Sequence, residues 1–331
     1  MSSKISNAGS SQSRMDIKNY YRKSAGFMSF MNGLFMLAVL AIAFYIAENF
    51  SVIANSTADS DNGIASLYYV VVFFGLFAFI FSLVVGISGI RRENDDNFKT
   101  QRVGAIICAA LYVIYIMGAV MSFTGEEYDI KDVEYIAYYM VGIGVSVAGI
   151  VYSVLAFIMT TKALKYCERK KGEIAEVPAG MNTDVMDKRR AAVMLSGYGI
   201  VTLAIWLMCW YFERQIISFE TNIAVDCGAD AMIFMAIKLL GILGTLYIAV
   251  CMFMNMKNKK AAYVMSKQAL IYNSVIVIIA LIFCIFTTNK VYVKSGYPAL
   301  EYYIFTYVLG AWAACVGYVT YSHIHMQRKT V

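Results

Sequence analysis

Runs of 20 or more mainly apolar residues alternate with polar segments along the chain. A helix needs about 20 apolar residues to cross the ~30 Å hydrocarbon core of a bilayer, because each residue rises about 1.5 Å. Eight runs meet this requirement: 27–50, 64–90, 103–123, 133–161, 191–212, 231–255, 269–288 and 300–322. The pattern predicts an all-α polytopic membrane protein with eight transmembrane helices.

Basic residues gather in every second polar segment. With the N-terminus placed in the cytosol, 23 of the 28 lysines and arginines fall on the cytosolic side, and 13 of the 22 acidic residues fall outside. Cytosolic loops of membrane proteins are enriched in Lys and Arg. We therefore expect both termini in the cytosol and a location in the plasma or cell membrane. The net charge of +6 then indicates topology and contact with anionic lipids, not nucleic-acid binding.

The spacing of the runs divides the chain into two similar halves. Residues 27–161 and 191–322 each hold four runs, offset by about 167 positions. The cytosolic segments are an N-terminal tail (1–26), a linker (162–190) and a C-terminal tail (323–331), and a short helix is expected from Thr183 into the fifth span. Since both halves start on the same side, the pattern predicts a parallel internal repeat.

Small residues mark one face in the last span of each half. Gly142, Ser146 and Gly149 in the fourth span are matched by Gly310, Ala314 and Gly317 in the eighth. Small residues allow helix backbones to approach closely. Two interpretations remain open: the faces pack inside each half, or they meet in a seam between the halves.

Lys238 is a charged residue eight positions into the sixth apolar run, roughly 10 Å below the expected outer boundary. A lysine at the centre of a span costs about 2.5–3.5 kcal/mol on insertion scales, and less where it can reach an interface. It shares a helix face with Gly241, Thr245 and Ala249, so we expect its side chain to point into the bundle. It is either an anion or proton site, or a structural lysine that reaches outward to carboxylates such as Glu213.

Other polar side chains also interrupt the apolar runs. Tyr112 and Tyr115, three residues apart in the third span, either line a cavity or fill the core. Asn32 and Asn273 are expected to form hydrogen bonds between helices. Tyr68 lies at the predicted outer end of the second span, where a belt of aromatic side chains is typical.

The remaining chemistry in the sequence is sparse. Seven cysteines are scattered without a C-x-x-C pair and are interpreted as small apolar fillers. The two histidines, His323 and His325, do not share a helix face, and neither a zinc-protease nor a phosphate-loop motif occurs. We expect no cofactor, no metal and no enzymatic activity.

Two classes of function remain. One is a solute or ion translocator that uses an intramembrane polar site built from Lys238, Thr245, Tyr112 and Tyr115. The other is a non-catalytic membrane assembly subunit that binds a partner membrane protein or further copies of itself. The lack of proline-broken helices and of further intramembrane charges weighs against a translocator, whereas Lys238 weighs for one.

Overall fold

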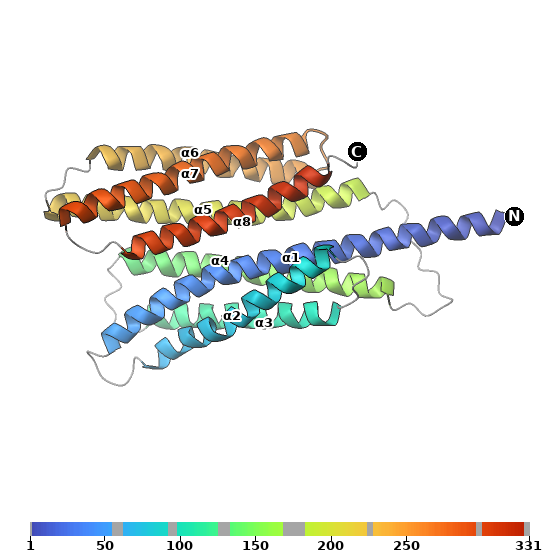
Figure 1. Ribbon diagram of the computed structural model, residues 1–331, viewed down its shortest axis with the longest axis horizontal. Helices are drawn as coiled ribbons and strands as arrows, with labels where there is room; N and C mark the ends of the chain where they lie inside the picture. Colours follow the sequence, from blue (N-terminus) through green and yellow to red (C-terminus); the bar gives the residue numbers. More distant parts are fainter. Residues whose placement is uncertain are drawn as a thin grey trace. The chain divides into compact units, whose positions relative to one another are not determined.

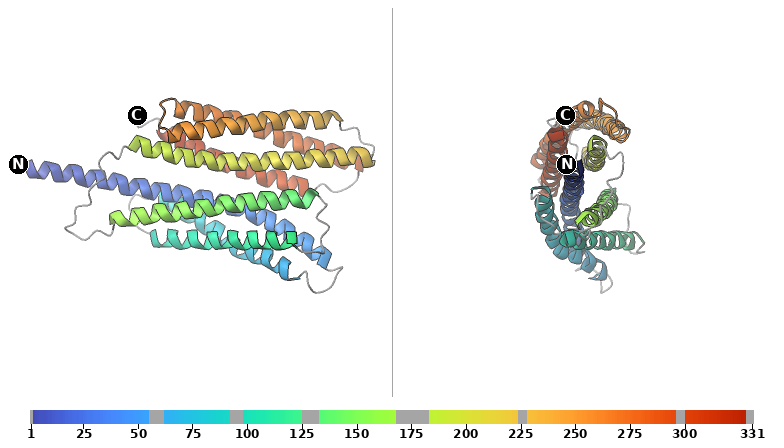
Figure 2. Two further views of the ribbon diagram at one scale, coloured as in Figure 1. Left: turned by 180° about the vertical axis from the view of Figure 1, so that it is seen from behind. Right: turned by 90° about the vertical axis from the view of Figure 1, so that its right-hand side faces the viewer.

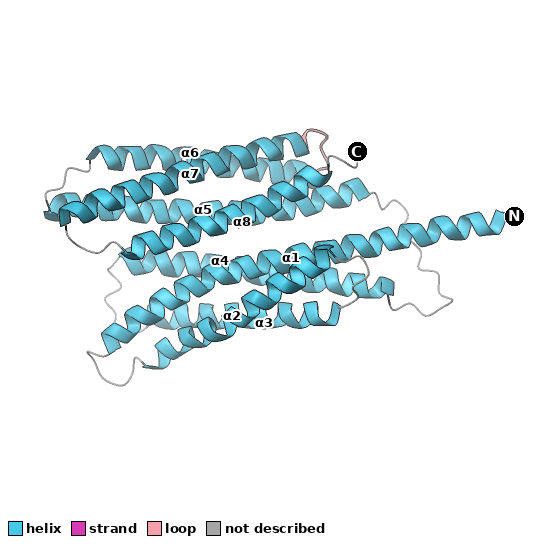
Figure 3. Ribbon diagram, in the orientation of Figure 1, coloured by secondary structure: helices cyan, strands magenta, loops and turns pink. Residues whose placement is uncertain are grey.

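The computed structural model describes residues 2–54, 62–91, 98–124, 133–167, 183–223, 228–295 and 300–327. Within these ranges the chain is helical except for the turn at 257–261 (Figures 1 and 3). The helices are α1 (Ser2–Ala54), α2 (Asn62–Arg91), α3 (Phe98–Thr124), α4 (Val133–Cys167), α5 (Thr183–Ile223), α6 (Gly228–Met256), α7 (Ala262–Ser295) and α8 (Leu300–Gln327).

Seven of the helices contain segments that are long and apolar enough to cross a membrane. These segments are Lys18–Phe44, Ser66–Arg91, Phe98–Ser122, Tyr139–Leu164, Asp187–Leu207, Ala229–Met256 and Ala262–Thr287. They identify a multi-pass integral membrane protein, as the apolar runs predict. α8 is helical, but its side chains before Leu309 lie outside the described part, so the eighth crossing stays a prediction.

The helix ends refine the boundaries expected from the sequence. α5 begins at Thr183, which confirms the short helix predicted to lead into the fifth span. α1 begins at Ser2 and α4 continues to Cys167, so residues 2–26 of the expected tail and 162–167 of the expected linker are helical, and the first membrane segment begins at Lys18. A helix can extend past the bilayer because its backbone hydrogen bonds are internal and do not depend on lipid.

The chain forms two compact units. The first comprises residues 1–128 and 142–183, and the second comprises 129–141 and 184–331. Figure 2 shows the long helices of each unit running side by side. The membrane segments of α1 and α5 are 78% and 72% buried, against 28% for α2 and 33% for α6. The tandem internal repeat itself stays a prediction.

α1 and α2 touch through their backbones. A Cβ on Gly26 of α1 would lie 2.9 Å from the carbonyl oxygen of Gly86 and 2.9 Å from the carbonyl carbon of Gly89, both on α2. A Cβ on Gly86 would in turn lie 2.7 Å from the amide nitrogen of Phe30. These separations leave no room for side chains, so glycine at these positions permits the contact.

The turn between α6 and α7 is closed by a left-handed residue. Asn258 has φ 54°, and the amides of Asn258 and Lys259 donate to the carbonyls of Asn255 (3.1 Å) and Met254 (3.0 Å). This pair of bonds is the Schellman arrangement that ends many helices, with Asn in place of the usual glycine. Lys188 of α5 donates to Asn258 Oδ1 at 2.7 Å, which ties the turn to the start of α5.

Candidate functional site

A cluster of polar groups joins α5 to α6 in the second unit. Thr245 Oγ1 lies 3.0 Å from the Gly241 carbonyl, 3.1 Å from Trp206 Nε1 and 3.1 Å from Thr202 Oγ1. The Thr245 hydroxyl donates to the Gly241 carbonyl and accepts from Trp206 Nε1, and it lies beside the Thr202 hydroxyl, which also donates to the Gly199 carbonyl at 2.8 Å. The Thr245 hydroxyl is therefore used for helix packing.

Two glycines on α6 accept large side chains from the neighbouring helices. A Cβ on Gly241 would overlap the indole ring of Trp206 from α5. A Cβ on Gly244 would lie 2.6 Å from Oδ1 of Asn273 on α7, and Asn273 Nδ2 donates to the Gly244 carbonyl at 2.7 Å. This bond confirms the interhelical role expected for Asn273.

Lys238 lies one turn before Gly241 on α6 and is half-buried. Gly241 and Thr245 are buried, whereas Ala249, the next member of the face, is exposed. The inward orientation and the salt bridge to an outer carboxylate stay predictions, since the side chains of Glu213 and Glu220 lie outside the described part.

Tyr112 is fully buried in the first unit and links α3 to α1. Its hydroxyl donates to the backbone carbonyl of Asn32 at 2.8 Å and to Asn32 Oδ1 at 3.0 Å. Its ring occupies the space that a Cβ on Gly149 of α4 would take. Of the two interpretations for Tyr112, the structure favours core filling, and it confirms the interhelical hydrogen bond expected for Asn32.

Tyr115 repeats this arrangement one turn further along α3. Its ring and hydroxyl occupy the space beside Gly142 of α4, and Ser146, between the two glycines, is buried. The Tyr115 ring also meets the ring of Tyr68 edge-on, with centroids 5.7 Å apart. Tyr112 and Tyr115 therefore belong to the same interface as the small-residue face of the fourth span, namely the contact between α3 and α4.

Tyr68 lies near the end of the segment Ser66–Arg91, as expected, but its side chain faces protein and not lipid. Tyr68 is fully buried, and its hydroxyl lies 3.2 Å from Ser122 Oγ of α3. Its neighbour Tyr69 is 41% exposed. Adjacent residues on a helix point about 100° apart, so Tyr68 faces α3 even though it sits near the end of a span.

The small residues of α8 also contact their own unit. A Cβ on Gly310 would lie 3.1 Å from Leu281 Cδ1 of α7, and one on Gly317 would lie 3.1 Å from Tyr198 Cε2 of α5. Ala314 is exposed. Packing inside each half thus accounts for these glycines, as it does for those of α4, while a seam between the halves stays a prediction.

Sequence patterns did not identify the largest contributors to this site. Trp206 and Tyr198 sit in an apolar run, where an aromatic side chain does not interrupt the pattern. Their polar atoms nevertheless bond to Thr245 and to Ser274 (3.0 Å). A glycine on one span combined with a Trp or Tyr on another could have indicated these contacts. A buried Trp or Tyr ring needs space beside it and a hydrogen-bond partner for its polar atom.

The chemistry open to these groups is limited. Among the described residues, no group of three or more His, Cys, Asp or Glu side chains could hold a metal ion. Of the five described cysteines, Cys108, Cys209, Cys251 and Cys284 are buried, as expected for apolar fillers, and Cys315 is exposed. Comparison of the chain with protein-family models, curated proteins and solved structures finds no match.

Proposed function

We propose that this multi-pass membrane protein is a non-catalytic assembly subunit whose bundle binds a partner membrane protein or a second copy of itself. The observation that carries the proposal is that candidate polar groups are already hydrogen-bonded within the bundle. The hydroxyls of Thr245 and Tyr112 are bonded to neighbouring helices, which leaves them little capacity to bind a solute. These groups hold the helices together.

Lys238 supplies the polar contact for assembly. It keeps exposed surface on α6, and its neighbours Met235, Leu239 and Ile242 are 53%, 57% and 46% exposed. Beside its contacts within the chain, a cation at this depth of a bilayer gains from an anionic or polar group on a partner helix. The exposed apolar neighbours supply a surface for packing around that contact.

A translocator is the second candidate, and the position of Lys238 favours it. The lysine lies within the membrane segment Ala229–Met256, on the helix that also carries Thr245. Ionisable residues at that depth often belong to ion or proton pathways. In this function Lys238 binds the anion or relays the proton, and the Thr202–Thr245–Trp206 cluster holds α6 in position.

The orientation proposed for the chain follows from its charges. Placing both termini in the cytosol of a cell membrane puts the turn 257–261, with its exposed Lys257, Lys259 and Lys260, on the cytosolic side. Clusters of lysines beside membrane helices attract anionic lipids. This attraction is diffuse, because the ammonium groups are exposed and need no single binding geometry.

Site-specific photo-cross-linking in native membranes tests the assembly function. A benzophenone amino acid replaces Leu239, and the matched control replaces Val264, an exposed residue of α7. We expect a cross-linked product of one defined mass from position 239 that Lys238→Met abolishes and Lys259→Met does not. Contrary results are the absence of such a product or its persistence in Lys238→Met.

The translocator is tested with purified protein in vesicles. Proton and chloride gradients are imposed, and flux is compared between the wild type, Lys238→Met and Lys259→Met. The assembly proposal predicts no difference between the three. Gradient-driven flux that is lost only in Lys238→Met would overturn it in favour of the translocator.

A further inference from the structure

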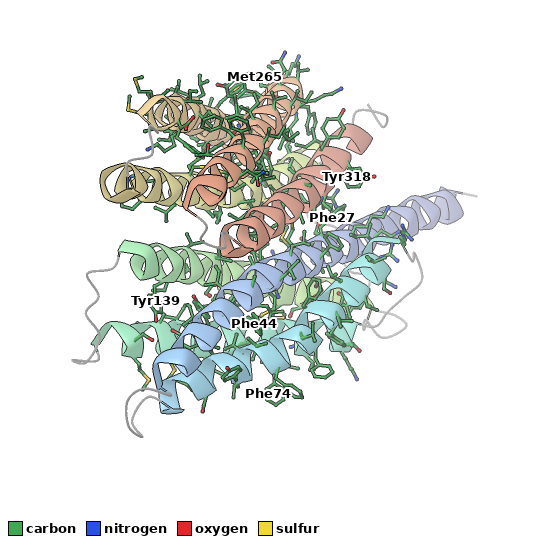
Figure 4. The ribbon with its side chains drawn as sticks, turned by 60° about the vertical axis from the view of Figure 1, so that its left-hand side comes forward. Phe27, Phe44, Phe74, Tyr139, Met265 and Tyr318 are labelled. Carbon is green, nitrogen blue, oxygen red and sulfur yellow. The ribbon has the colours of Figure 1, made fainter. Side chains whose placement is uncertain are left out.

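An open groove runs between α2 and α3 in the first unit. It has a volume of about 940 Å³. Its walls include Phe74, Phe77 and Val84 of α2 and Ile107 of α3, which are 53%, 60%, 62% and 46% exposed. Figure 4 shows Phe74 on α2, at the edge of the first unit. The groove is therefore an outward-facing apolar surface.

Small residues contribute to the depth of the groove. Gly104 and Ala78 line it, and a Cβ on Gly104 would come within 2.5 Å of the Phe81 ring. Gly104 lets that ring lie close against α3, and Ala78 adds only a methyl group. The groove therefore has aromatic and aliphatic walls, which suit a flexible hydrocarbon chain.

The polar side chains lining the groove come from one end of it. Lys99 and Thr100 belong to the first turn of α3, and Lys99 is exposed. The other lining residues are apolar or glycine. On α2 the groove extends from Phe74 to Val84, about 15 Å along the helix, which is half of the ~30 Å hydrocarbon core. The groove therefore matches one leaflet in length and carries a cation at one end.

We propose that this groove is a binding site for one anionic phospholipid. An acyl chain lies along Phe74, Phe77 and Val84, and the phosphate contacts the ammonium of Lys99. The chain occupies the apolar length, and the cation selects a negatively charged headgroup over a neutral one. The inference rests on the membrane assignment, and it names a single site, unlike the diffuse attraction of the turn 257–261.

Neighbouring charges set the design of the test. Arg91 ends α2 close in sequence to the groove, and Arg102 stacks on the Phe157 ring of α4, 4.7 Å from its centroid. The sequence between α2 and α3 also holds Glu93, Asp95 and Asp96, which lie outside the described residues. A change at Lys99 alone separates the groove from this mixed background.

Native mass spectrometry of the full chain, titrated with phosphatidylglycerol or phosphatidylcholine, measures the binding. We expect the wild type to prefer phosphatidylglycerol, and Lys99→Gln to weaken that lipid about five-fold. Phosphatidylcholine should lose less, because its choline cation offsets the charge of its phosphate. Val84→Trp, which fills the groove, should weaken both lipids. The matched control Lys259→Gln should weaken neither, because its ammonium lies on the turn of the second unit.

Three results would overturn the proposal. One is an unchanged phosphatidylglycerol affinity in Lys99→Gln, and another is an equal loss in Lys259→Gln, which would indicate diffuse attraction. The third is a disulfide cross-link between two copies of Phe77→Cys, which would show that a second chain covers the groove. Lys99→Gln should leave the Leu239 cross-link and any ion flux intact, so failure here is distinguishable from failure of the proposed function.

Discussion

Tyr112 and Asn32 are 80 residues apart in the sequence, and the tyrosine hydroxyl donates to both oxygen atoms of the asparagine. The tyrosine hydroxyl lies 2.8 Å from the Asn32 carbonyl oxygen and 3.0 Å from its Oδ1. The contact joins α3 to α1, and α4 packs against the same ring through Gly149. One side chain thus fixes the positions of three helices of the first unit.

Tyr112→Phe tests the contribution of this hydrogen bond. The ring stays in place and only the hydroxyl is lost, so we expect the free energy of unfolding to fall by about 0.6–1 kcal/mol. Thermal unfolding in detergent measures the change. Tyr318→Phe is the control, because Tyr318 is 73% exposed. Equal midpoints for the two variants would show that the bond contributes nothing to stability.

Gly149→Ala and Gly144→Ala form a matched pair on α4. A Cβ at 149 would overlap the Tyr112 ring, whereas a Cβ at 144 would meet nothing within 4 Å. We expect Gly149→Ala to destabilise the protein by about 1–3 kcal/mol through overpacking. Gly144→Ala should be neutral or stabilising by up to about 1 kcal/mol, because alanine favours helix. The reverse order in unfolding experiments would contradict the packing of α3 on α4.

Thr245→Val removes a hydroxyl at nearly constant volume. Trp206 Nε1 loses its acceptor and Thr202 loses a neighbour, so the expected cost is about 1 kcal/mol or more. The control is Thr287→Val, since the described bond of Thr287 is to Phe283 of its own helix. Denaturation in a urea and detergent mixture compares the two. Thr245→Val as mild as the control would argue against a hydrogen-bonded contact between α5 and α6.

Asn258→Gly and Asn258→Ala separate two roles of one residue. Both remove the acceptor of Lys188, but only alanine also opposes the left-handed backbone at φ 54°. We expect the alanine variant to be less stable than the glycine variant by about 1–2 kcal/mol. Unfolding midpoints of both variants give the difference. If alanine is tolerated as well as glycine, the Schellman turn at this position is wrong.

Cysteine accessibility tests the proposed orientation. A single cysteine introduced at Lys259, which is exposed on the turn 257–261, should stay unreactive toward an impermeant maleimide in intact cells and react after permeabilisation. A cysteine at Gly172, in the segment between α4 and α5, should behave in the same way. Labelling of either position from outside would refute the eight-span topology.

The spans could be predicted from the sequence because the length of an apolar run is a one-dimensional property. Most of the candidate site could not, because its contacts depend on which helices become neighbours. The sequence singles out both Tyr115 and Gly142 as candidates. Only the packing of α3 against α4 shows that the Tyr115 ring fills the space beside Gly142. The position of Tyr68 near a span end follows from the sequence, whereas the direction of its side chain toward α3 does not.

The short turn between α6 and α7 has a consequence for biosynthesis. Nδ2 of Asn273 on α7 bonds to Gly244 of α6, and Nδ2 of Asn255 on α6 bonds to Ser266 of α7 at 2.8 Å. Either helix alone in lipid would lose these interhelical amide partners, which raises the cost of partitioning from the translocon. Because only five residues, 257–261, connect the two helices, we expect α6 and α7 to enter the bilayer together as one hairpin.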